Sequence, residues 1–184
     1  MNAHHTPAIG TAVGLRHRCR GSVRMSGLRL GAWLLAVGGL VPALPAQAAS
    51  DPVCRVDISG AQIAFGTYDP LSSLPLDAAG AIDVVCDKNN VVVRVELDRG
   101  DGGSYLPRQM RSGAQTLAYN LYVDSARSSV FGDGAGGTQA GMGITSAIGG
   151  GEFRARVPVY GRIAPGLDAA FGSYSDHINV TVAF

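Results

Sequence analysis

The chain has 184 residues, of which 46% are hydrophobic and 16% are charged, and its formal net charge is +1. This length allows one domain, or one domain preceded by a targeting segment. No run of Lys and Arg follows residue 48, so the main part of the chain lacks the charge pattern that binds nucleic acid or an anionic membrane.

The first 48 residues are typical of an export signal. They contain five arginines and no acidic residue, and an uncharged apolar run extends from residue 30 to residue 44. Ala46-Gln47-Ala48 then matches the small-x-small pattern of a signal peptidase site. We therefore expect residues 1–48 to be a signal peptide that is removed on export. Met25 could open a compact signal by itself, in which case residues 1–24 are an upstream extension.

A membrane anchor is the alternative for this segment. The apolar run is interrupted by Pro42 and is shorter than the ~20 residues that a transmembrane helix needs, which favours cleavage. Without the five arginines, ten basic and fourteen acidic residues remain, a net charge of about −4. We expect an exported, acidic protein without a membrane anchor.

The cysteines indicate one disulfide. Removal of residues 1–48 takes Cys19 away and leaves Cys54 and Cys86 as an even pair in an exported chain. A bridge that closes a loop of about thirty residues should stabilise the fold by roughly 3 to 4 kcal/mol. A redox or metal site is disfavoured, because there is no Cys-x-x-Cys and His177 is the one histidine after residue 48.

Apolar and polar residues alternate with a period of two along most of the remaining chain, as they do in half-buried strands. Long alternating segments cover residues 91–97, 117–123, 153–159 and 174–184. Shorter candidates cover residues 55–65, with a break at Ser59-Gly60, and residues 82–86. Turn-rich stretches separate them at residues 68–75, 98–104, 132–143, 149–151 and 164–172. The pattern predicts one antiparallel β-sandwich domain, all-β, over residues 49–184.

The last strand runs to the carboxyl-terminal Phe184 with no turn or polar tail after it. Such a strand can leave an unpaired sheet edge that templates another chain, or an earlier strand can cover that edge. Periodicity alone leaves both possibilities open.

The sequence offers little for catalysis. His177 lies on the polar face of its predicted strand, and nucleophilic catalysis needs a base with both a nucleophile and an orienting group beside it. The turns around Asp98 and Asp133 lack the alternating oxygen ligands of a calcium loop. We expect no catalytic, cofactor or metal site, and therefore not an enzyme. A secreted hydrolase that uses a pair of the fourteen acidic residues is the alternative.

At several points the chain resembles the spore coat protein U domain family, which includes Csu-type, or archaic, chaperone-usher pilus subunits. The resemblance covers the whole chain after residue 48, in the family's order. It is carried by Cys54, Phe65-Gly66-Thr67-Tyr68, Ile82-Asp83-Val84-Val85-Cys86, residues 117–124, Val159-Tyr160-Gly161-Arg162-Ile163 and residues 172–184.

The resemblance implies an immunoglobulin-like sandwich that is incomplete because it lacks its last strand. The open groove would be filled first by a periplasmic chaperone and then, at an outer-membrane usher, by the N-terminal extension of another pilus or coat subunit. It implies a structural role in a surface pilus or coat, with adhesion and biofilm formation. The groove edge would be formed by Ile178, Val180, Val182 and Phe184.

The segment before Cys54 departs from the family pattern. Residues 49–53 span five positions at about 3.3 Å each, which is too short for a donated strand, and Pro52 lacks a backbone donor. The chain is therefore expected to accept a strand without donating one, as a terminal subunit would. Two alternatives remain open. The signal could be processed elsewhere, or the protein could be a self-sufficient coat or carbohydrate- or surface-binding module that uses residues 98–104 and 132–143.

Overall fold

The structure is a computed structural model that describes residues 10–19, 50–57, 60 and 62–184. The described residues form strands and connecting loops, with no helix among them. The strands are β1 (Gly10–Cys19), β2 (Cys54–Asp57), β3 (Gln62–Thr67), β4 (Leu76–Cys86), β5 (Val92–Leu97), β6 (Arg108–Ser112), β7 (Gln115–Tyr122), β8 (Gly141–Ile144), β9 (Ser146–Gly149), β10 (Glu152–Ile163) and β11 (Tyr174–Ala183).

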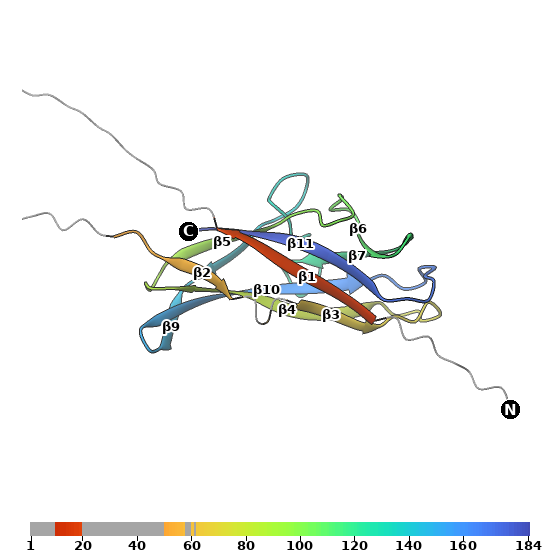
Figure 1. The fold of residues 1–184 in the computed structure, drawn as a ribbon, viewed down its shortest axis with the longest axis horizontal. Coiled ribbons are helices and arrows are strands. Elements are labelled where there is room, and N and C mark those ends of the chain that lie inside the picture. The colour runs from red at the N-terminus through yellow and green to blue at the C-terminus, as the bar shows by residue number, and fades with distance from the viewer. Residues whose placement is uncertain (1–9, 20–49, 58–59, 61) are drawn as a thin grey trace, which may run out of the picture.

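These strands form two layers of a β-sandwich (Figure 1). One layer has the order β2-β4-β10-β7, with β9 on β10. The other has the order β6-β11-β1-β3, with β5 on β11 and β8 on β5. The β6–β7 hairpin joins the two layers. The predicted all-β sandwich is confirmed.

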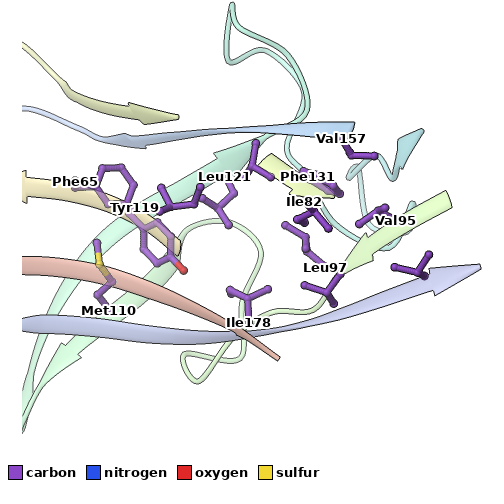
Figure 2. Close-up of a cluster of buried hydrophobic side chains, with 14 of the residues drawn as sticks. Phe65, Ile82, Val95, Leu97, Met110, Tyr119, Leu121, Phe131, Val157 and Ile178 are labelled. Carbon is purple, nitrogen blue, oxygen red and sulfur yellow. The ribbon is translucent and has the colours of Figure 1, made fainter. Parts of the chain in front are cut away.

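The core lies between the layers, and the alternation read from the sequence places it there. Along β11, every second residue from Tyr174 to Val182 is buried. Along β10, Ala155, Val157 and Val159 are buried in the same way. Figure 2 shows how side chains from both layers meet in this cluster. One buried face on each strand accounts for the period of two.

Besides the hairpin and the longer loops, two nearly continuous strand segments of the described chain switch from one layer to the other. The first is the segment of β2 and β3, which breaks near Gly60 as predicted: β2 pairs with β4, whereas β3 pairs with β1. The second crosses at buried Thr145, between β8 and β9. The hydroxyl of Thr145 accepts from Val91 N at 2.8 Å and donates to Lys88 O at 2.9 Å. These bonds fix the point of crossing.

The predicted disulfide is present between Cys54 and Cys86. Cys54 begins β2 and Cys86 ends β4, and the two residues are direct partners in the antiparallel ladder. The bridge therefore ties the outermost strand of its layer to the next strand.

Three strands after residue 49 were not predicted. β6 begins with buried Arg108, a residue type that periodicity assigns to the surface. β8 lies partly within the glycine-rich stretch that the sequence predicted to be a turn. A Cβ at Gly141 would lie 2.7 Å from Phe131 Cζ, so this glycine permits close packing rather than a turn. β9 is four exposed residues with no alternation.

Candidate functional site: a strand slot between β3 and β11

β1 lies between β3 and β11 and joins them into one sheet (Figure 1). It runs parallel to β11 in a register from Thr11↔Tyr174 to Cys19↔Val182, which covers nine residues of β11. It runs antiparallel to β3 over residues 10–14. β1 therefore occupies a slot one strand wide, which we call the β3/β11 slot.

β1 comes from the segment that the sequence assigns to the export signal and its upstream extension. The predicted apolar run and cleavage site lie outside the described residues, so the signal peptide stays a prediction. The strand itself was not predicted, because the arginines of this segment were assigned to the basic part of an export signal and its upstream extension.

The other edge of β11 is occupied along its length. β6 pairs with β11 at Ser175, and β5 pairs with residues 180–183. Between them the loop after β5 takes the place of a strand: Asp98 N donates to Asn179 O at 3.1 Å, and Asn179 N donates to Asp98 Oδ1 at 3.0 Å. In the part of the chain that the structure describes, the β3/β11 slot is thus the one place beside β11 where a strand could be exchanged.

We expect Asp98→Ala to lower the free energy of unfolding by about 2 kcal/mol. The Asp98 carboxylate accepts from Asn179 N, from Asn179 Nδ2 and from Gly100 N, and alanine would leave these donors without their partner. Urea unfolding of the oxidised full chain would measure the change. Asp168→Ala, in the loop before β11, is the matched control and should change stability by less than about 0.5 kcal/mol.

The core-facing row of β11 forms one wall of the slot. Ile178, Val180 and Val182 are at most 1% exposed and share register with residues of β1. These are three of the four residues predicted to form the groove edge. Phe184 follows the end of β11, is partly buried against the core, and has no register partner in β1. Their role as a binding edge stays a prediction.

A buried carboxylate interrupts this apolar row. Asp176 is fully buried and accepts from Tyr119 Oη at 2.6 Å and from Asp101 N at 2.8 Å. Burial, followed by the nearby charge of Asp176, raises the pKa of the Tyr119 phenol, which therefore stays protonated as a donor. Asp176 shares the period of buried Tyr174 and Ile178, but alternation does not reveal its partners.

In the described part of the chain, the hydrogen-bond partner of the His177 ring is a carboxylate and not a nucleophile. The ring Nδ1 lies 2.9 Å from Asp101 Oδ2, and both side chains are about half exposed. Among the described residues, no group of three or more His, Cys, Asp or Glu side chains is arranged to hold a metal ion. No helix in the described part of the chain is long and apolar enough to cross a membrane.

No curated protein matches the chain. One matching solved structure is the CsuC–CsuE chaperone–tip adhesion subunit pre-assembly complex of the archaic chaperone-usher Csu pili of Acinetobacter baumannii. The identity is 20% and the TM-score 0.46, over 72% of this chain and 40% of that chain. The family model of the Spore Coat Protein U domain matches residues 41–181, a range that excludes β1. The chain belongs to the Spore Coat Protein U domain family.

Proposed function

We propose that the protein is a structural subunit of a chaperone-usher-assembled surface pilus or secreted coat, and that its β3/β11 slot accepts a strand from another subunit. One observation supports this most: among the described strands, β1 alone joins β3 to β11, and β1 lies before the predicted cleavage site and outside the family match. Removal of residues 1–48 would take β1 away. The processed domain would then need a strand from elsewhere to complete its sheet.

Such a strand would bind by β-augmentation. Main-chain hydrogen bonds to both walls give affinity, and alternate side chains that enter the core give selectivity. The slot extends over nine residues of β11, from Tyr174 to Val182. Its wall is buried and apolar at Ile178, Val180 and Val182. These features suit an extended segment with apolar residues at alternate positions.

The order of partners follows from the resemblance to Csu-type subunits. A periplasmic chaperone would fill the slot first, and a neighbouring subunit would replace it at the outer-membrane usher. Because residues 49–53 are too short to donate a strand, we place the protein at an end of the assembly. Exposure at the cell surface there would give it a role in adhesion and biofilm formation. The proposed function requires no cofactor.

The test compares the processed protein with and without a strand. The protein is exported from the full precursor with its disulfide intact, with and without a Csu-type periplasmic chaperone. A peptide of residues 10–19 is then added, and a scrambled peptide of equal composition is the control. At a hundred times its dissociation constant, the matched peptide should stabilise the domain by about 2.7 kcal/mol.

Soluble yield that depends on the chaperone, together with stabilisation by the matched peptide alone, would support an open slot. A processed protein that unfolds cooperatively as a stable monomer, and whose stability neither peptide changes, would contradict it. That result would favour a self-sufficient coat or surface-binding module instead.

A further inference from the structure

β3 is the far wall of the slot, and it must stay in place while the slot is empty. It lies two ladder spacings from β11, which at about 4.8 Å per spacing is roughly 10 Å. In the described part of the chain, β1 is the one strand that forms a ladder with β3. Loss of β1 therefore removes this ladder, and other contacts have to hold β3 at this distance.

Both ends of β3 are attached to the opposite layer. Upstream, β2 pairs with β4 and is bridged to it by the disulfide. Downstream, the buried Tyr68 donates from its hydroxyl to Ala164 O at 3.0 Å and accepts from Leu167 N at 2.7 Å. The ends of β3 are thus held near β4 and β10 whether or not a strand fills the slot.

The middle of β3 packs against two glycines of the layer that contains β4 and β10. A Cβ at Gly161 of β10 would lie 2.5 Å from Phe65 Cζ and 3.3 Å from Ile63 Cγ2. A Cβ at Gly80 of β4 would collide with Ile63 Cδ1. Neither glycine has a left-handed backbone conformation, so close approach of β3 is the reason for glycine at both positions.

The contact at Gly161 is the more rigid of the two. The Phe65 ring packs edge-on against Tyr119, with ring centroids 5.9 Å apart and an interplanar angle of 76° (Figure 2). Tyr119 is in turn held by its hydrogen bond to Asp176 of β11. Ile63 Cδ1 is the end of a flexible side chain and can move, whereas the Phe65 ring cannot turn away without losing its contact with Tyr119.

We propose that Gly161, assisted by Gly80, is a positioning residue. It holds β3 at a distance from β11 that leaves room for one strand, and so keeps the slot open for an incoming strand. This inference rests on the proposed function. A wall that is already in place reduces the ordering that the incoming strand must bring about, and this preorganisation raises affinity.

The test measures refolding in the presence of a strand. Processed protein with its disulfide intact is unfolded in urea and diluted into buffer with increasing amounts of the residue 10–19 peptide. The readout is the peptide concentration that gives half of the maximal folded yield. Gly161→Val should raise this concentration by about tenfold or more, because the new side chain displaces Phe65 and moves β3. Gly60→Ala is the matched control, since a Cβ there meets nothing within 4 Å, and it should change the value less than twofold.

Two further measurements separate positioning from a general loss of stability. In the unprocessed chain the strand is attached and its effective concentration is high, so Gly161→Val should still refold there. Gly161→Ala should show a smaller defect, and adding Phe65→Leu to it should restore peptide binding because the clashing ring atom is removed.

Equal peptide dependence in wild type and Gly161→Val would contradict the proposed positioning role of Gly161. So would a failure of Phe65→Leu to rescue Gly161→Ala. If Gly161→Val does not refold, the comparison of Gly161→Ala with the double variant decides the matter alone. Failure of the wild-type protein to respond to the peptide would instead overturn the proposed function. The two failures are thus distinguishable.

Discussion

Arg108→Met should lower the free energy of unfolding by about 3 kcal/mol. The side chain is fully buried, and its guanidinium binds three separate segments of the chain. Nη1 donates to Asn120 Oδ1 at 3.0 Å. Nη2 donates to Asp98 O at 2.8 Å and to Phe131 O at 2.7 Å. Methionine would keep most of the aliphatic stem but remove all three hydrogen bonds, and the buried Phe131 O would lose this donor.

The expected loss is smaller than the sum of three lost hydrogen bonds. The buried charge of Arg108 is poorly solvated, which lowers its pKa, and methionine removes that desolvation cost. Urea unfolding of the oxidised full chain would measure the change. The control is Arg111→Met in the same strand, where the side chain is exposed and the effect should stay within about 0.5 kcal/mol. A change below about 1 kcal/mol for Arg108→Met would show that water replaces the guanidinium.

The double variant Cys54→Ser/Cys86→Ser should lose about 3 to 4 kcal/mol of stability. The bridge closes a loop with a sequence separation of 32, and its loss gives the unfolded chain more conformations. The folded state is affected as well, because β2 pairs with β4 over four residues only and is held at Cys54 by the bridge. We expect β2 to separate from β4 before the rest of the sandwich unfolds.

Reducing agent provides the control for this prediction. It should lower the stability of the wild-type protein to that of the double variant, and it should leave the variant unchanged. Equal stability of the oxidised wild type and the variant would contradict the expected contribution of the bridge.

The four long strands that alternation predicted have a single buried face. β5, β7, β10 and β11 bury every second residue for most of their length, so their period of two is visible in the sequence. β6 was missed because Arg108 finds its partners on distant segments, which no local pattern reveals. β8 was missed because its glycines serve close packing against Phe131 and β10, and a glycine-rich sequence is otherwise typical of turns.

The candidate site was predictable on one side only. The row of Ile178, Val180 and Val182 follows from the alternation of the last strand, and the resemblance to a known family gave it a role. The second wall, β3, lies more than a hundred residues earlier in the chain, and its place beside the slot depends on long-range pairing through β1. Periodicity identifies a buried face, but it does not identify which strand lies next to it.

The last strand, β11, is prone to aggregation when no strand fills the slot beside it. Residues 178–184 read Ile-Asn-Val-Thr-Val-Ala-Phe, with no charged residue, no proline and no glycine. Seven such residues beside an unpaired sheet edge have the composition of segments that form amyloid. On the proposed function, the exporting cell would need to cover this strand as soon as it emerges, and subunits left uncovered are expected to aggregate through β11 rather than remain monomers.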